Sequence, residues 1–217
     1  MSGHLFDMTG GSEPWPERLG PGTVLLHGFA VADVATLLAD LRRIVKTAPF
    51  RHMITPGGQL MSVAMTNCGA LGWVSDDTGY RYAALDPHSG LPWPPMPDSF
   101  SGLARAAARQ AGFPGFAPDA CLINRYAAGT RLSLHQDRDE RDLNAPIVSV
   151  SLGLPAIFLL GSTQRTDKPH HLALSHGDVL VWGGPDRLRY HGVRPLQPGD
   201  HPLLGAQRIN LTFRQAA

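Results

Sequence analysis

Polar and apolar residues alternate without a break along residues 208–214, near the end of the chain. Successive side chains of a β-strand point to opposite faces, so this pattern predicts a strand with one apolar and one polar face. The polar face carries Arg208, Asn210, Thr212 and Arg214. Two arginines on the inner face of a sheet are costly to bury unless an anion lies between them. We therefore interpret this face as a binding site for a carboxylate or phosphate, rather than as the solvated side of an edge strand.

Short segments of the same kind recur from residue 120 onward. The expected strands cover residues 120–126, 131–137, 146–152, 156–161, 171–175, 178–182, 189–194 and 207–214. Their spacing is typical of a β-barrel or β-sandwich.

The first half of the chain mixes strands with helices. The expected elements are strands at 23–29, 50–55 and 60–67 and helices at 33–47 and 99–111. Pro56-Gly57-Gly58 predicts the turn of a hairpin. Residues 68–97 are rich in glycine, proline and aromatic residues and show little periodicity, and residues 1–22 are expected to be a loosely held extension.

Composition restricts the class of protein. A chain of 217 residues with 43% hydrophobic and 17% charged residues suits one folded domain. The net charge of +1 means that a nucleic-acid partner would have to be held by a local basic patch. Cys68 and Cys121 are too few for a disulfide framework, so we expect a cytoplasmic protein. We also expect no signal peptide, no membrane span and a monomer.

Two histidine–acid pairs are candidate metal ligands: His135-Gln136-Asp137 and His176-Gly177-Asp178. Each pair lies two residues apart, and so on one face of a strand. This spacing suits a 2-His-1-carboxylate triad, which leaves three metal positions open. Chance alone gives about 0.8 such pairs in this composition. The central glycine predicts a turn for the second pair, so we favour the first. The third ligand would come from a distant strand: we favour His191, and His201 is its main rival.

An open triad together with the arginines of residues 208–214 predicts an Fe(II) enzyme with a diacid cosubstrate. One end of the diacid would chelate the iron, and its far carboxylate would pair with an arginine. Asn124 and Tyr126 share one face of an expected strand and could donate hydrogen bonds to the same diacid.

Several segments match the motifs of one known family. They are MSVAMTNCG (61–69) ahead of Gly72-Trp73, PDACLINRY (118–126), LSLHQD (132–137), IVSVSLG (147–153), HGD (176–178) and the alternating segment 208–214. With these motifs the chain, from about Trp15 to Arg214, resembles the AlkB family of Fe(II)/2-oxoglutarate-dependent nucleic-acid repair dioxygenases, in particular its bacterial members. The resemblance implies a mainly β fold with flanking α-helices, in which a double-stranded β-helix (jelly-roll) core carries an N-terminal α/β nucleotide-recognition lid. It divides the chain into an extension (1–22), the helices and lid of the same domain (23–117) and the catalytic core (118–217).

The resemblance also implies roles for individual residues. Iron would be bound by His135, Asp137 and His191. The 2-oxoglutarate site would comprise Asn124, Tyr126, Arg208, Asn210 and Arg214. Of these, Arg208 would pair with the far carboxylate, and Arg214 would orient the iron-bound end or Asp137. The nucleotide would be held by Trp73, Tyr80, Tyr82, Asp139 and Arg165.

The implied reaction uses Fe(II), 2-oxoglutarate and O2 to demethylate N-alkylated bases such as 1-methyladenine and 3-methylcytosine, in single-stranded DNA or in RNA. It would release formaldehyde and succinate and so reverse alkylation damage. A base within a duplex cannot reach the iron, so the target would be single-stranded or flipped out. Trp73 would stack on the base, and Asp139 would accept a hydrogen bond from its exocyclic amine and favour a cationic lesion. The expected basic rim consists of Arg131, Arg138, Arg141, Arg165 and Lys168. Gln59 stands where close relatives commonly carry tyrosine.

Two alternatives remain at this point. One is a 2-oxoglutarate oxygenase that acts on a protein or small molecule, and Trp73, Asp139 and Arg165 argue against it. The other is a non-enzymatic, cupin-like barrel with a structural metal. Such closed sites need four protein ligands, commonly including cysteine, and neither cysteine here has a metal-motif spacing.

Overall fold

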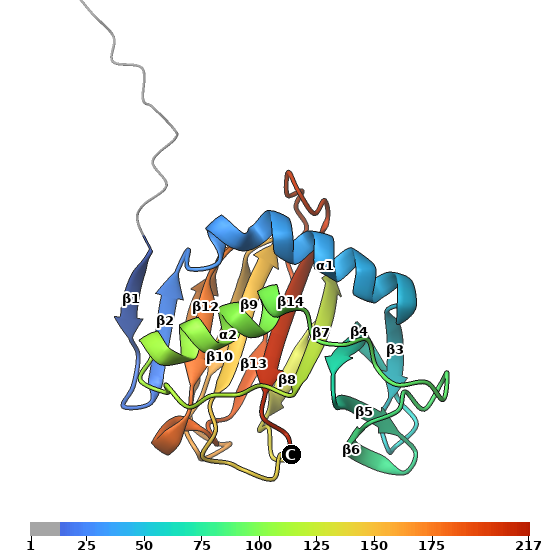
Figure 1. Ribbon diagram of the computed structural model, residues 1–217. Coiled ribbons are helices and arrows are strands. Elements are labelled where there is room, and N and C mark those ends of the chain that lie inside the picture. Colours follow the sequence, from blue (N-terminus) through green and yellow to red (C-terminus); the bar gives the residue numbers. More distant parts are fainter. Residues whose placement is uncertain (1–13) are drawn as a thin grey trace, which may run out of the picture.

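An eight-stranded antiparallel sheet runs through the computed structural model, which describes residues 14–217 (Figure 1). Its strands lie in the order β1 (Trp15–Arg18), β2 (Thr23–His27), β12 (Val179–Trp182), β9 (Ile147–Gly153), β14 (Gln207–Arg214), β7 (Ala120–Ala127), β4 (Leu60–Gly69) and β3 (Arg51–Ile54). A second sheet has the order β11 (His170–Leu174), β10 (Ala156–Leu160), β13 (His191–Val193) and β8 (Leu132–His135). A separate hairpin is formed by β5 (Gly72–Asp76) and β6 (Gly79–Ala83).

Apolar side chains from both large sheets pack together between them. The cluster includes Leu122, Ile147 and Trp182 from the eight-stranded sheet and Phe158 and Leu160 from the four-stranded sheet. The two antiparallel sheets therefore face each other, which confirms the predicted jelly-roll.

Two helices, α1 (Val34–Thr47) and α2 (Asp98–Gln110), cover the outer face of the eight-stranded sheet (Figure 1). The apolar residues of β14 point to this layer, where Phe213 meets the edge of Phe100 at a centroid distance of 5.9 Å. The polar residues of β14 consequently point into the space between the sheets. Two 3-10 helices, η1 (Val31–Asp33) and η2 (Gly184–Asp186), complete the regular elements. No helix within residues 14–217 is long and apolar enough to span a membrane.

Most of the elements expected from the sequence are present. Each of the eight strands predicted from residue 120 onward overlaps one of β7 to β14, and the two predicted helices correspond to α1 and α2. The strands predicted before residue 68 correspond to β2, β3 and β4, with β3 and β4 paired antiparallel across the predicted turn.

Two parts of the first 100 residues differ from expectation. β1 lies inside the predicted loose extension, where it pairs with β2 along its whole length and Trp15 stacks on His27. The hairpin β5–β6 lies within residues 68–97, which showed no strand pattern. Backbone pairing holds both segments, and backbone pairing requires no alternation of side chains. The first thirteen residues of the predicted extension lie outside the described residues.

Strands from the predicted front section and the predicted core share one sheet. β2 pairs with β12, and β4 pairs with β7. The boundary expected near residue 118 therefore divides the sequence but not the eight-stranded sheet.

A pair of glycine substitutions tests the close contact between the start of β2 and η2. A Cβ on Gly22 would lie 2.0 Å from the carbonyl oxygen of Gly183, whereas a Cβ on Gly102 within α2 meets nothing within 4 Å. We expect Gly22→Ala to reduce the free energy of unfolding by about 1–3 kcal/mol through overpacking. Gly102→Ala should increase it by about 0.5–1 kcal/mol through helix propensity. Urea denaturation measures both values, and a Gly22→Ala protein as stable as the parent would contradict the contact.

Candidate active site

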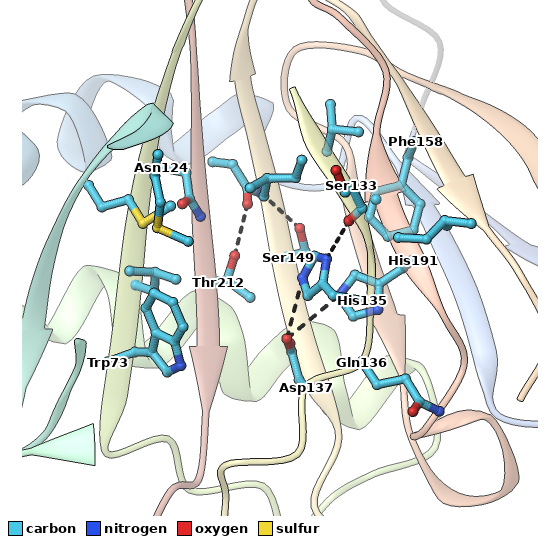
Figure 2. A pocket seen from close by; sticks show the side chains of 18 of the residues that line it. Trp73, Asn124, Ser133, His135, Gln136, Asp137, Ser149, Phe158, His191 and Thr212 are labelled. Atoms are coloured by element: carbon cyan, nitrogen blue, oxygen red, sulfur yellow. Dashed lines mark hydrogen bonds and ion pairs between the residues drawn. The ribbon is translucent and has the colours of Figure 1, made fainter. Parts of the chain in front are cut away.

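Three candidate metal ligands meet at one end of the four-stranded sheet (Figure 2). His135 ends β8 and lies directly opposite His191 on β13, and Asp137 follows two residues after His135. The Oδ1 atom of Asp137 lies 3.6 Å from Nε2 of His135 and 3.7 Å from Nε2 of His191. Antiparallel pairing thus brings together two histidines that are far apart in the sequence. Among residues 14–217 this is the one cluster of histidine, cysteine or acidic residues with a geometry suited to a metal.

Hydrogen bonds fix both imidazoles in the tautomer that a metal requires. Nδ1 of His135 lies 2.8 Å from the carbonyl oxygen of Ser133, and Nδ1 of His191 lies 3.1 Å from that of Arg189. A carbonyl oxygen only accepts, so each Nδ1 carries the proton and each Nε2 presents its lone pair to the common point. Burial lowers the pKa of His191 to about 4, so this imidazole is neutral at pH 7.

The carboxylate of Asp137 is held by Arg214. Its Oδ2 atom accepts hydrogen bonds from Nε and Nη2 of Arg214 at 3.0 and 2.7 Å, which leaves Oδ1 facing the imidazoles. Burial alone would raise the pKa of Asp137, but the charge of Arg214 outweighs it and holds the pKa well below its usual range. One charged oxygen and two neutral nitrogens are the donor set of an open 2-His-1-carboxylate iron site, so these residues fit Fe(II).

The rival histidines lie elsewhere. His176 is in the turn between β11 and β12, where its Nδ1 atom accepts a hydrogen bond from the amide of Gly153. The Asp178 carboxylate accepts from two other backbone amides, as the turn interpretation predicted. His201 lies beside His176, with ring centroids 4.4 Å apart, and neither histidine belongs to the cluster around Asp137.

A cavity of about 530 Å³ opens from the three ligands into the space between the sheets. The predicted cosubstrate residues all contribute to its wall: Asn124, Tyr126, Arg208, Asn210 and Arg214. Phe158 and Trp182 lie against the ring of His191, with centroid distances of 5.8 and 5.0 Å, and form an apolar wall beside it.

Arg208 is a buried cation without a counter-anion among the described residues. Its side chain packs over Tyr126, with Cζ 5.0 Å from the ring centroid, and Nη2 donates to Ser151 Oγ at 3.0 Å. Its Nε and Nη1 atoms are buried without a hydrogen-bond partner in this part of the chain, as is Oδ1 of Asn124. Burial lowers the pKa of Arg208 from its usual value. Unpaired buried donors of this kind are strongly unfavourable, so the site fits an anionic group such as the far carboxylate of a diacid.

The remaining cosubstrate candidates have protein partners. Asn210 donates to Ser149 Oγ and to the carbonyl oxygen of Val150, and its own oxygen accepts from Thr212. These bonds use both amide hydrogens, so a direct hydrogen bond from Asn210 to the diacid would require one of them to break. Of the two alternatives considered for Arg214, the structure shows the contact with Asp137.

Of the five candidate nucleotide contacts, three line the cavity: Trp73, Tyr80 and Asp139. Trp73 donates from Nε1 to Oδ2 of Asp139 at 2.8 Å and stacks on Tyr80 at a centroid distance of 5.6 Å. Tyr82 and Arg165 do not line the cavity. The Tyr82 hydroxyl donates to buried Glu140 instead, and the guanidinium of Arg165 lies over Tyr190.

Two of the five residues of the predicted basic rim belong to the cavity lining. Arg131 and Arg138 border the cavity, whereas Arg141, Arg165 and Lys168 do not. Gln59 is exposed and also lies outside the lining.

Two buried residues beside the site escaped the sequence analysis. Glu140 and Arg187 form an ion pair at 2.8 Å, with side chains only 2% and 3% exposed. Glu140 stands in the charged segment 138–141, which is typical of a solvated loop. Nothing in the sequence distinguishes a buried carboxylate there from an exposed one.

A jelly-roll with an open 2-His-1-carboxylate site and an anion pocket defines a class of iron oxygenase. The chain belongs to the 2OG-Fe(II) oxygenase superfamily, whose family model matches residues 22–214. It is 56% identical over 212 residues to the alpha-ketoglutarate-dependent dioxygenase AlkB of Escherichia coli, covering 98% of both chains. It is 31% identical to the Arabidopsis thaliana DNA N(6)-methyladenine demethylase ALKBH1D, covering 89% of this chain and 49% of that protein. The structure of OsALKBH1 matches with a TM-score of 0.80 and 31% identity, covering 93% of this chain and all of that one.

These findings confirm the predicted enzyme class. The chain is a 2-oxoglutarate-dependent dioxygenase that uses Fe(II), 2-oxoglutarate and O2. Membership of this family sets aside the non-enzymatic metal-binding barrel.

Metal binding by histidine variants tests the assignment of the ligands. We expect His135→Ala to weaken Co(II) binding by at least about 10-fold, because it removes one of three ligands. His176→Ala is the matched control and should bind Co(II) like the parent protein. Anaerobic titration followed by visible absorption measures both affinities. Loss of binding in His176→Ala, with binding retained in His135→Ala, would overturn the assignment.

Substitution of Arg208 tests the anion pocket. Arg208→Gln should weaken 2-oxoglutarate binding by about 10- to 150-fold, the effect of losing a charge-assisted hydrogen bond of 1.5–3 kcal/mol. Arg125→Gln provides the control. Arg125 directly precedes Tyr126 on β7, so its side chain lies on the face of the strand opposite to that of Tyr126, and it does not line the cavity. Isothermal titration of the Co(II)-loaded protein gives both dissociation constants, and equal affinity in the two variants would place the far carboxylate elsewhere.

Proposed function

We propose that this dioxygenase removes methyl groups from N-alkylated bases, of the 1-methyladenine and 3-methylcytosine type, in single-stranded DNA, with RNA as a second substrate. One observation carries the proposal: a stacking surface and a carboxylate stand together on the wall of the cavity that holds the candidate iron ligands. These groups are Trp73, stacked on Tyr80, and Asp139. The name of the Arabidopsis relative, a DNA N(6)-methyladenine demethylase, supports the same substrate class.

The proposed base pocket combines the two interactions that a flipped base requires. The Trp73 ring offers a π-face for stacking, which is worth about 1–3 kcal/mol per base. Asp139 is exposed and uses Oδ2 to accept from Trp73, so its other oxygen is available to an exocyclic amine. A carboxylate beside the base also favours the fixed positive charge of an N-methylated adenine or cytosine.

The rest of the cavity would hold the cosubstrate. Arg208 would pair with the far carboxylate of 2-oxoglutarate, and Asn124 and Tyr126 would border its chain. Burial raises the pKa of Tyr126 to about 12, so its hydroxyl is a hydrogen-bond donor at pH 7. When bound, iron supplies the oxidation of the methyl carbon by O2, coupled to conversion of 2-oxoglutarate to succinate and carbon dioxide. The hydroxymethyl group formed on the base nitrogen is unstable and leaves as formaldehyde.

Nucleic acid would meet the protein at the mouth of the cavity. Arg131 and Arg138 are exposed there and supply the local positive charge that a chain of net charge +1 needs to hold phosphate groups. Both cysteines are buried and free, which suits a reducing compartment. We therefore propose that the enzyme acts in the cytoplasm, and we propose separately that it acts as a monomer.

Formaldehyde release from a single-stranded oligonucleotide that carries 1-methyladenine tests this function. With Fe(II), ascorbate and 2-oxoglutarate under air, we expect one formaldehyde for each succinate formed. His135→Ala should lose both products, because the iron site is incomplete. Succinate without formaldehyde, for methylated DNA and RNA alike, would reveal a working oxygenase with a protein or small-molecule substrate and would overturn the proposal.

A further inference from the structure

The hairpin β5–β6 is fastened at two points to the segment that follows β8. Trp73 on β5 donates to Asp139 at 2.8 Å, and Tyr82 on β6 donates to Oε1 of Glu140 at 2.7 Å. The same short segment contains Asp137, a proposed metal ligand. The hairpin that is proposed to receive the base is therefore attached to the same stretch of chain that carries the metal-binding carboxylate of Asp137.

Glu140 is the common partner of the two arginines that hold Asp137. Arg214 grips the side chain of Asp137 and also lies 3.3 Å, from Nε, from Oε1 of Glu140. Arg187 grips the main chain: Nη1 donates to the carbonyl oxygen of Asp137 at 2.9 Å, while Nη2 donates to Oε2 of Glu140 at 2.8 Å. Both carboxylate oxygens of Glu140 are thus engaged. One residue outside the ligand set fixes Asp137 from two sides.

The charges around Asp137 and Glu140 balance one another. The cluster holds two cations, Arg187 and Arg214, and two anions, Asp137 and Glu140, all with side chains at most 10% exposed. Removal of one member of a buried balanced cluster leaves an uncompensated charge, which is far more costly than loss of a surface pair. Burial raises the pKa of Tyr82 well above its usual value, so its hydroxyl keeps the proton that it donates to Glu140.

We propose that Glu140 is a positioning residue that couples the hairpin β5–β6 to the metal site, through the contacts from Tyr82 to Glu140, from Glu140 to Arg187 and Arg214, and from both arginines to Asp137. The proposal rests on the metal centre and base pocket proposed above. It also gives Tyr82 a role that differs from direct contact with the nucleotide. Its hydrogen bond to Glu140 links the position of the hairpin to the orientation of the Asp137 carboxylate.

A double-mutant cycle on metal affinity tests the coupling without any nucleic acid. Glu140→Gln keeps the shape of the side chain but sets an amide NH2 group against an arginine. We expect it to weaken Co(II) binding by about 10-fold or more, as loss of an outer-shell partner commonly does. Tyr82→Phe removes only the hydroxyl and should weaken binding by about 3-fold, the effect of one modest hydrogen bond. Because both act through one chain of contacts, the double variant should bind about as weakly as Glu140→Gln alone.

Two controls separate coupling from a general loss of structure. Arg81→Gln breaks the ion pair with Asp76 inside the hairpin, 2.8 Å long, but touches none of the coupling contacts, so its Co(II) affinity should equal that of the parent. Thermal unfolding of the metal-free variants shows whether each still folds. Should Glu140→Gln be too unstable to assay, Tyr82→Phe paired with Glu140→Asp gives the same cycle.

Two results would overturn the proposal. One is parental Co(II) affinity in a folded Glu140→Gln protein, which would make Glu140 a purely structural residue. The other is multiplication of the two effects in the double variant, which would mean that Tyr82 and Glu140 act independently. Neither readout involves a base or turnover, so failure of the demethylation assay would leave this result standing, and the reverse also holds.

Discussion

The buried ion pair between Arg214 and Asp137 is the interaction on which the site depends. At 2.7 Å and with both side chains at most 10% exposed, it requires two charged groups to be taken out of water. Such burial is favourable only when the remaining hydrogen-bonding groups are satisfied as well, and here Glu140 and Arg187 supply that satisfaction. In return, Asp137 keeps one orientation, with one oxygen committed to Arg214 and the other directed at two imidazoles. Without these contacts the Asp137 carboxylate could adopt several rotamers and would bind a metal less well.

The second constraint is the register of β14. Its apolar residues fill the layer beneath the two helices, while its polar residues form the wall of the cavity. A slip of one residue would exchange these faces and place both arginines among Phe100 and the other apolar side chains of that layer. The hydrophobic core and the cosubstrate site therefore specify the same register. β14 pairs with β7 and β9 on its two sides, which holds that register on both edges.

Site residues could be predicted from the sequence where a local pattern, such as strand alternation or a turn motif, determines which side chains lie together. The inward face of β14, the pair His135 and Asp137, and the turn at His176 could all be predicted from local patterns. His191 needed the pairing of β13 with β8, which no local pattern specifies. Glu140 was missed because burial of an acidic residue in a charged loop depends on partners far away in the chain. The nucleotide role expected for Tyr82 came from the family resemblance, and its hydrogen bond to Glu140 could not be predicted because it joins β6 to a loop far away in the sequence.

Arg208 and Arg214 lie on the same face of the same strand, but only Arg214 is paired with carboxylates. Arg214 has two carboxylates within 3.3 Å, whereas Arg208 has no anion among its protein partners. The charge of Arg214 is therefore balanced within the protein, whereas the charge of Arg208, in another part of the cavity wall, is not. In the proposed site, a dianionic cosubstrate would pair one carboxylate with Arg208 and direct the other to the metal, so both of its charges would be compensated. Because a base carries no such negative charge, it would have no electrostatic preference for Arg208, which agrees with the proposed base site at the stacking surface of Trp73 in another part of the cavity.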